Sequence, residues 1–399
     1  MTAGGPASGG PASGEPASKV HTVLCIQPVA EEGGSDQALL RLVAQLGRAG
    51  WQVHVALPEP SPMTERFARA GAQLHVVPMR RVSTSHGLAG WALYALNWPL
   101  SVARLWLLCR RCHAELVHTN SLHSWYGWAV ARLAGLPHVW HAREIVTQSG
   151  VALGLERALC RRFATVVLAA SQAIADQLPG APLQVVYEEV DPAEYFPQRA
   201  GRARRRLGLD DRAPLVGYVG RVDTWKGVEV LLEAKCHLDE LRPGTALVVA
   251  GAAVKGKEAF AADLQARAAQ VGARWAGPLP GPEAADLIAD LDVLAYPSTG
   301  PEPWGLALVE AMACGVPVVA TDAGGPREML AGSSPSTGRL VPPGDAARLA
   351  DAICELLPRT TDAESRKRRS PLRRGALAPY PELFARALSG RGTQGRAAG

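Results

Sequence analysis

The chain has 399 residues, of which 47% are apolar, and its formal net charge is +5. This length predicts two or three domains, and the apolar fraction excludes a largely disordered chain. The mild positive charge permits an anionic partner but does not predict nucleic-acid binding. The seven cysteines are scattered and odd in number, which favours a reducing compartment over a disulfide framework.

Residues 1–18 consist almost entirely of Gly, Pro, Ala and Ser. This composition predicts a disordered tail, because it offers almost no apolar surface to bury. The segment has neither a basic stretch nor an apolar stretch, so it does not resemble a targeting peptide. We therefore expect a cytoplasmic protein.

Segments typical of strands and helices alternate over residues 19–195, which predicts a doubly wound α/β domain resembling a Rossmann fold. The expected strands are Val20–Gln27, Gln52–Leu57, Leu74–Val77, Leu116–His118, His138–His141, Ala164–Ala169 and Leu183–Tyr187. The expected helices are Gln37–Arg48, Leu88–Arg111, Ser121–Leu133 and Ser171–Gln177.

Two short segments of this domain are candidate ligand contacts. Gly33 and Gly34 lie between the first strand and its helix, where glycine lets the backbone approach a ligand and the helix N-terminus favours an anion. A tight turn without a ligand is an equal alternative. His141 and Arg143 come at the carboxyl end of a strand, the edge at which open α/β sheets bind ligands. A solvated loop is the alternative there.

The long apolar segment Leu88–Arg111 has the approximate length of a membrane span, which needs about 20 apolar residues. Asn97, Pro99 and Arg104 interrupt it, so a buried or interfacial helix is the better interpretation. Its tryptophans and the flanking arginines leave open a peripheral contact with the inner face of a membrane. The flanking arginines are Arg80, Arg81, Arg110 and Arg111.

A polar and charged stretch from Glu188 to Arg212 predicts the connection between two domains. The α/β pattern then restarts, which predicts a second Rossmann-like domain over residues 196–358. The expected strands are Pro214–Gly220, Ala246–Ala250, Arg274–Ala276, Val293–Tyr296, Val316–Ala320 and Gly338–Val341. The expected helices are residues 228–239, Ala259–Gln270, Ala284–Asp290, Gly305–Ala313 and Ala346–Leu357.

The second domain contains a turn with two cations. Gly220 and Arg221 follow the first strand, and Lys226 and Gly227 precede the helix. Such a turn offers positive charges and backbone amides together, which suits a diphosphate. Ordinary surface charges are the alternative, and the Gly-Arg and Lys-Gly spacing makes that alternative weaker.

The stretch Ser298–Gly325 contains two carboxylates, Glu302 and Glu310, eight positions apart across a loop and the start of a helix. Glu302 precedes the helix, whose first N–H groups favour negative charge in front of them. Glu310 lies about two turns into it. A glutamate at this place is often only a helix cap, so its meaning depends on the rest of the chain.

Together these motifs resemble a retaining glycosyltransferase of family 4 with the GT-B architecture. The motifs are Gly220-Arg221, Lys226-Gly227, the E-x7-E pair Glu302 and Glu310 with E-A-M-A-C-G-V-P-V-V-A-T, and Pro343-Gly344-Asp345. The resemblance covers roughly residues 20–357 and is strongest in the second half. It implies two Rossmann-like domains, an acceptor domain and a donor domain, facing across a cleft.

The resemblance also implies a role for each motif residue. Arg221 and Lys226 would hold the diphosphate of a nucleotide sugar with Gly220 beside them, and Glu310 would bind the ribose. Glu302 would contact hydroxyls of the transferred sugar, close to the amides of Trp304, Gly305 and Leu306. Gly33 and Gly34 would lie toward the phosphate or acceptor, His141 near the reacting carbon, and Arg143 on the acceptor side.

The implied reaction is metal-independent transfer of a hexosyl group from a UDP- or GDP-sugar, with no cofactor, to a glycan, a lipid-linked acceptor or a small molecule. Such activity serves polysaccharide or glycolipid synthesis. Two cations with a helix N-terminus suit a departing diphosphate. Glu302 and Glu310 are not expected to act as the carboxylate pair of a glycosidase.

Two regions depart from the family pattern. The family usually has Asn-Gly before Val/Ile-Asp, whereas this chain has Glu188-Glu189-Val190-Asp191. Either this loop points away from the cleft or the activity is altered. Residues 359–399 are polar and basic where the family has a long helix crossing back to the first domain. Only Tyr380–Leu388 is helix-like, so it is a displaced crossing helix or part of a disordered tail, and the basic run is interpreted as solvated rather than lipid-bound.

Two other functions remain open at this point. A sugar-nucleotide-binding homologue with altered catalysis is suggested by Glu188 and Glu189 and by the unusual tail. A GT-B-type nucleotide-sugar epimerase or a phosphorylase is less favoured, because the E-x7-E context matches transferases and the sequence shows no cofactor-lysine motif.

Overall fold

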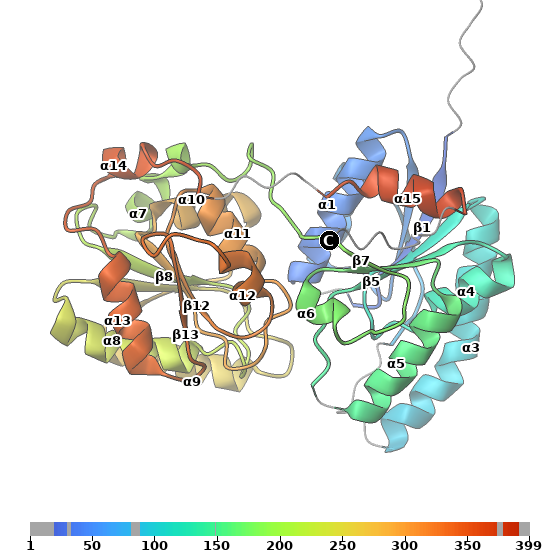
Figure 1. The fold of residues 1–399 in the computed structure, drawn as a ribbon, viewed down its shortest axis with the longest axis horizontal. Helices are drawn as coiled ribbons and strands as arrows, with labels where there is room; N and C mark the ends of the chain where they lie inside the picture. Colours follow the sequence, from blue (N-terminus) through green and yellow to red (C-terminus); the bar gives the residue numbers. More distant parts are fainter. Residues whose placement is uncertain (1–19, 30–32, 81–87, 148, 373–377, 391–399) are drawn as a thin grey trace, which may run out of the picture.

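The computed structural model describes residues 20–29, 33–80, 88–147, 149–372 and 378–390. The described chain forms two lobes, each built on a parallel sheet covered by helices (Figure 1). The fold is therefore α/β with two Rossmann-like lobes, as the alternation of segments predicted. The predicted disordered tail, residues 1–18, lies outside the described residues.

The first lobe contains a seven-stranded parallel sheet in the order β3-β2-β1-β4-β5-β6-β7. Its strands are β1 Thr22–Ile26, β2 Gln52–Leu57, β3 Gln73–Val76, β4 Leu116–Thr119, β5 His138–Ala142, β6 Val166–Ala169 and β7 Leu183–Val185. Its helices are α1 Gly34–Arg48, α2 Pro62–Arg69, α3 Leu88–Arg111, α4 Gly127–Ala134, α5 Gly150–Phe163 and α6 Gln172–Ala175. The central strands are buried throughout, because helices cover both faces of the sheet.

The second lobe contains a six-stranded parallel sheet in the order β10-β9-β8-β11-β12-β13. Its strands are β8 Leu215–Val219, β9 Ala246–Ala250, β10 Arg274–Gly277, β11 Val293–Tyr296, β12 Val318–Thr321 and β13 Gly338–Val341. Its helices are the 3₁₀ turn Pro197–Arg199, α7 Arg202–Leu207, α8 Val228–Leu241, α9 Glu258–Gln270, α10 Gly281–Asp290, α11 Leu306–Ala313, α12 Gly325–Leu330, α13 Ala346–Leu356 and α14 Ala363–Lys367.

Strand order reverses once in each sheet, between β1 and β4 and between β8 and β11. In open α/β sheets, ligands bind outside the carboxyl ends of the strands at this reversal. The loops that follow these strands carry Gly33 and Gly34 in the first lobe and Lys226 and Glu302 in the second. The topology thus brings both glycine-containing turns to ligand-binding edges.

Helices α2, α5, α7, α12 and α14 were not predicted, and α4 begins at Gly127 instead of Ser121. Ser121 belongs to a loop, where its hydroxyl donates a hydrogen bond of 2.5 Å to Glu144. Strand β12 begins at Val318 and not at Val316, because Pro317 has no N–H to contribute to a ladder. The predicted strands otherwise agree with the structure to within a few residues.

The prediction of a solvated basic tail is wrong for Arg366 and Arg369, whereas Arg368 is exposed as expected. Arg366 is fully buried, and its guanidinium lies 3.8 Å from the Asp292 carboxylate and donates to Thr361 at 2.8 Å. Arg369 donates to Asp292 at 2.6 Å. Arg204 also pairs with Asp292, at 2.9 Å. These arginines pack into the second lobe because Asp292 provides a buried counter-charge.

Helix α15, Tyr380–Leu388, returns to the first lobe, where it packs against α1 and β5 (Figure 1). Its buried side chains join the core of that lobe, with Phe384 fully buried and its ring edge-on to Trp51 at 5.9 Å. Of the two interpretations of this segment, a displaced crossing helix agrees with the structure. The C-terminal segment thus contributes to the core of the domain that begins the chain.

Replacing Phe384 with Ala is expected to destabilise the first lobe by about 3–5 kcal/mol, the usual cost of emptying a buried phenylalanine site. Chemical denaturation of the full chain measures this value. Arg386→Ala changes an exposed position of the same helix and is the control, with a change expected within about 0.5 kcal/mol. Equal stability of the Phe384 variant and the unmodified chain would contradict the packing described here.

Candidate active site

The turn after β8 holds Lys226 in a fixed place. Gly227 ends this turn at φ +69°, a left-handed conformation, and caps the start of α8. A Cβ atom at Gly227 would lie 1.9 Å from the carbonyl oxygen of Pro297. Glycine is therefore required by the close approach of the Lys226 turn to the loop after β11.

Lys226 and Glu302 form a buried ion pair at this junction. The Lys226 ammonium lies 2.5 Å from a Glu302 carboxylate oxygen and also donates to the Tyr296 hydroxyl at 3.0 Å. Ser298 donates to the same Glu302 oxygen at 3.2 Å. Burial lowers the pKa of Lys226, and the attraction of Glu302 opposes this shift. Two predicted site residues from different loops are thus in direct contact.

The backbone around Glu302 is held by the loop after β12. Glu302 N–H donates to Ala323 at 3.2 Å, and its carbonyl accepts from Gly325 at 2.7 Å. Helix α11 then begins at Leu306, after Gly305 at φ +93°, and no side chain caps its N-terminus. The amides at the start of α11 therefore stand next to the Glu302 loop, an arrangement that favours an anion.

Glu310 faces the first lobe. Its carboxylate accepts a hydrogen bond of 2.9 Å from Arg41 of α1, and both side chains are largely buried. The predicted ribose contact is therefore occupied by an arginine in this structure. Binding of a ribose hydroxyl to Glu310 would compete with this contact.

The turn with Gly33 and Gly34 lies against the second lobe. A Cβ atom on Gly33 would stand 3.7 Å from the side chain of Arg221, and one on Gly34 would stand 3.6 Å from Leu306. Gly33 therefore borders the cation turn, and Gly34 borders the start of α11. The structure brings these predicted residues of both lobes to one interface.

His141 and Arg143 lie deeper in the first lobe than the sequence suggested. His141 is fully buried, and its Nδ1 atom accepts from the Arg143 guanidinium at 3.2 Å. Arg143 also donates to Asn120 at 2.8 Å and to Glu188 at 2.7 Å. Burial, followed by the charge of Arg143 and then His118, holds the pKa of His141 well below its usual range. His141 is therefore a neutral imidazole.

Glu188, which departs from the family pattern, turns its carboxylate into the first lobe. It accepts from Arg143 at 2.7 Å and from the Tyr380 hydroxyl at 2.6 Å, and its side chain is only 4% exposed. The negative charge is thus neutralised by Arg143 instead of facing a diphosphate. Within the loop that was expected either to point away from the cleft or to alter activity, the side chain of Glu188 therefore points into the first lobe.

Sequence reasoning missed three groups that complete this region. Arg41 binds Glu310 from eight positions after Gly33, and no local pattern marked it. Tyr296 had been noted only as the end of a strand, although its hydroxyl accepts from Lys226. Asn120 links Arg143 to the first turn, and its place directly after a buried strand was a usable signal.

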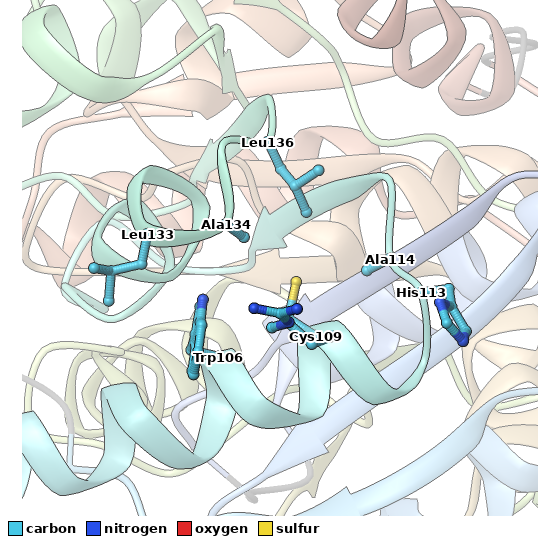
Figure 2. A pocket seen from close by; sticks show the side chains of 8 residues that line it. Trp106, Cys109, His113, Ala114, Leu133, Ala134 and Leu136 are labelled. Atoms are coloured by element: carbon cyan, nitrogen blue, oxygen red, sulfur yellow. The ribbon is translucent and has the colours of Figure 1, made fainter.

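A pocket of about 420 Å³ lies elsewhere, between the C-terminal ends of α3 and α4 (Figure 2). Trp106, Cys109 and His113 border it from α3 and the residues that follow, and Leu133 and Leu136 border it from α4 and its loop. None of the predicted site residues lines this pocket. We therefore place the candidate active site at the interface of the lobes and not here.

The described residues also bear on metal binding and on membrane crossing. In the part of the chain that the structure describes, no group of three or more His, Cys, Asp or Glu side chains is arranged to hold a metal ion. Likewise, no helix among the described residues has the length and apolar character needed to cross a membrane.

Comparison with known proteins identifies the class. Residues 33–211 match the model of the glycosyl transferase 4-like domain, and residues 201–371 match that of glycosyl transferases group 1. A D-inositol 3-phosphate glycosyltransferase from Stackebrandtia nassauensis is 30% identical over 292 residues, 66% of this chain and 63% of that protein. A GDP-mannose-dependent alpha-mannosyltransferase from Mycobacterium tuberculosis is 28% identical over 349 residues, 81% of this chain and 84% of that protein.

Among solved structures, Alr3699/HepE from Anabaena in complex with UDP and glucose superposes with a TM-score of 0.72 and 24% identity, over 92% of this chain and 99% of that one. This likeness shows the fold, which is GT-B. The two lobes and the matching models together define a glycosyltransferase. The chain belongs to the family 4 type of GT-B glycosyltransferases.

Gly227→Ala is expected to lower the melting temperature and to disrupt the Lys226 turn, because the new Cβ would strike the Pro297 carbonyl. Gly272→Ala is the matched control. Gly272 has a similar φ of +66°, but its Cβ would meet no atom within 4 Å, so it carries only the left-handed cost of about 1–2 kcal/mol. Thermal unfolding of both variants checks this, and equal losses would contradict the close approach.

Proposed function

We propose that this glycosyltransferase moves a hexosyl group from a nucleotide-diphosphate sugar to a glycan, a glycolipid or a small-molecule acceptor, with retention of the anomeric configuration. The observation that carries the proposal is the convergence of Lys226, Arg221 and the uncapped start of α11 on the edge where open α/β sheets generally bind ligands. A departing diphosphate carries negative charge, and fixed cations and amides stabilise such charge without reorganisation.

In this proposal Lys226 and Arg221 hold the diphosphate, with Gly220 beside them. Glu302 is the resting partner of Lys226, because a buried ammonium needs a counter-charge when no phosphate is bound. When the donor binds, the phosphate replaces part of that counter-charge and Glu302 becomes available to sugar hydroxyls. Amides near Trp304, Gly305 and Leu306 contribute to the same site.

Glu310 is proposed to bind the ribose after releasing Arg41. Gly33 and Gly34 are proposed to approach the phosphate or the acceptor, because they already border Arg221 and Leu306. His141 is proposed to lie near the reacting carbon. Arg143, proposed on the acceptor side, acts there through its contacts with His141 and Glu188.

We propose a metal-independent reaction with no cofactor, supported by two cations and a helix terminus where a metal would otherwise neutralise the phosphates. Retention is proposed to follow front-face attack, with the leaving phosphate taking the proton of the acceptor hydroxyl. The nucleotide part of the donor is proposed to be UDP or GDP. A solved structure of this fold contains UDP and glucose, and one relative is named as GDP-mannose-dependent.

The alternative of a sugar-nucleotide-binding homologue with altered catalysis loses part of its support. The extra charge of Glu188 is compensated by Arg143 and does not face the Lys226 turn. Of the C-terminal tail, which also suggested this alternative, Arg366 pairs with buried Asp292 of the second lobe and α15 joins the core of the first lobe. Transfer therefore remains the function that the geometry supports best.

The test is a transfer and hydrolysis assay with a panel of UDP- and GDP-sugars, run with and without EDTA, with the product anomer determined by NMR. Arg221→Ala and Lys226→Ala are each expected to reduce kcat by about 10²–10³, because each removes one group that stabilises the leaving diphosphate. Lys255→Ala changes an exposed lysine of the same lobe and is expected to be neutral. Unchanged turnover in both site variants would refute the mechanism, and donor binding without turnover in the unmodified chain would favour the alternative.

We also propose that the outer face of α3 contacts an anionic membrane surface peripherally, which suits a lipid-linked acceptor. Leu93, Leu96, Leu100 and Leu107 are exposed by 45–76% and share one helix face. Arg104, Arg110 and Arg111 extend the same face, and residues 88–111 contain no Asp or Glu. Exposed leucines beside arginines fit an interface of acyl chains and anionic headgroups.

Sedimentation with vesicles tests this surface. The unmodified chain is expected to bind vesicles that contain phosphatidylglycerol more strongly than neutral phosphatidylcholine vesicles. Replacing Leu93, Leu96 and Leu100 together with Ser is expected to reduce binding at least tenfold, because three apolar side chains that would insert into the membrane are lost. Leu241→Ser, at a leucine of the other lobe exposed by 49%, is the control. Equal sedimentation of all three proteins, or none, would refute the contact.

A further inference from the structure

Glu188 lies where the first lobe passes into the second, three residues after β7. Its carbonyl oxygen accepts a hydrogen bond of 2.9 Å from the indole of Trp304. The ring of its neighbour Tyr187 stacks on the same indole, with centroids 4.7 Å apart. Trp304 directly precedes Gly305 at the start of α11. The main chain at Glu188 is therefore tied to the part of the second lobe proposed to bind the donor.

The side chain of Glu188 makes contacts in the opposite direction. Its carboxylate binds Arg143 of the first lobe and the hydroxyl of Tyr380 on α15, at 2.7 and 2.6 Å. One residue thus joins three elements that are far apart in sequence: the connection between the lobes, the edge of the first sheet and the C-terminal helix. Figure 1 shows α15 lying over the first lobe.

A chain of buried hydrogen bonds continues from Arg143 to the glycine turn. Arg143 Nε donates to Asn120 at 2.8 Å, and Asn120 donates to Gln27 at 2.9 Å. Gln27 donates to Asp36 at 2.8 Å, and Asp36 accepts the backbone N–H of Gly33 at 3.3 Å. Gly33 borders Arg221 of the other lobe. The chain therefore ends at the proposed phosphate site.

Arg143 also fixes the protonation of His141. A guanidinium only donates hydrogen bonds, so Nδ1 of His141 accepts and the proton of the neutral ring is on Nε2. Nε2 is buried with no hydrogen-bond partner among the described residues, and the nearest Glu188 oxygen lies 3.7 Å away. The orientation of this histidine therefore depends on the Arg143–Glu188 pair.

We propose that Glu188 is a positioning residue for glycosyl transfer: through Arg143 it orients His141 and the Gly33 turn, and through Tyr380 it makes the C-terminal helix necessary for that geometry. The inference rests on the proposed function, which supplies the reaction to be positioned. It assigns a purpose to the glutamate that stands where the family has asparagine.

A gain in stability does not by itself explain the buried ion pair of Arg143 and Glu188. Removing two charges from water offsets most of their attraction, so a buried ion pair adds little net stability. Positioning is different, because a displacement of about 1 Å at a reacting group costs on the order of 10²-fold in rate. The donor is held in the ground state by groups of the second lobe. A disturbed Arg143 should therefore lower kcat more than it raises the KM for the donor.

The experiment compares Glu188→Gln, Tyr380→Phe and the double variant in the full chain, with kcat, donor KM and melting temperature measured for each. Glu188→Gln keeps the shape but leaves Arg143 uncompensated, and about a tenfold or larger loss of kcat is expected with KM changed less than about threefold. Tyr380→Phe removes one hydrogen bond, and a smaller loss of kcat is expected. The double variant should lose no more than Glu188→Gln alone, because both act through one chain of contacts.

Leu383→Ala is the matched control, since Leu383 is buried on the same helix and is outside the polar chain. It should lower the melting temperature while keeping kcat. A normal kcat in Glu188→Gln and Tyr380→Phe would overturn the inference. A loss of kcat in Leu383→Ala as large as that in Glu188→Gln would also overturn it, because the lower stability would then explain the loss. If Glu188→Gln fails to fold, Tyr380→Phe and its control still decide. Absence of turnover in the unmodified chain would instead refute the proposed function.

Discussion

The buried ion pair of Lys226 and Glu302 is the interaction on which the edge of the second lobe depends. An ammonium and a carboxylate that are both nearly out of water cannot persist alone, so the loops that carry them must meet. That requirement explains the glycine at position 227, where a Cβ atom would strike the Pro297 carbonyl, and the backbone hydrogen bonds that hold the Glu302 loop to the loop after β12. In the proposed donor site, a diphosphate and a sugar would exchange for these two charges.

Contacts between the lobes also pair charged and polar groups that come from different elements. Arg41 compensates Glu310 from across the interface, and the carboxylate of Glu328 accepts the free N–H groups of Gln172 and Ala173 at the start of α6. Each is a polar contact, as is common at interfaces between domains. Each lobe keeps its own packed core.

The C-terminal segment serves both lobes. Its first part neutralises Asp292 with Arg366 and Arg369, and its last helix adds Phe384 to the core of the first lobe. Tyr380 then reaches the connection between the lobes through Glu188. The positive charges of Arg366 and Arg369 are thus paired with buried acidic groups. The segment contacts one lobe through this ion-pair cluster and the other through one amphipathic helix.

The sequence alone determined the two α/β domains, because buried parallel strands need apolar runs and their crossovers need helical periodicity, as in residues 215–219 and 228–241. It also marked Gly220, Arg221, Lys226, Glu302 and Glu310, since their types and spacing are local. Tertiary structure decided what local patterns do not contain. The contact of Lys226 with Glu302 and that of Arg41 with Glu310 span 76 and 269 positions. The direction of Glu188 and the burial of Arg366 depended on partners that only folding supplies, because the cost of a buried charge is set by what lies beside it in space.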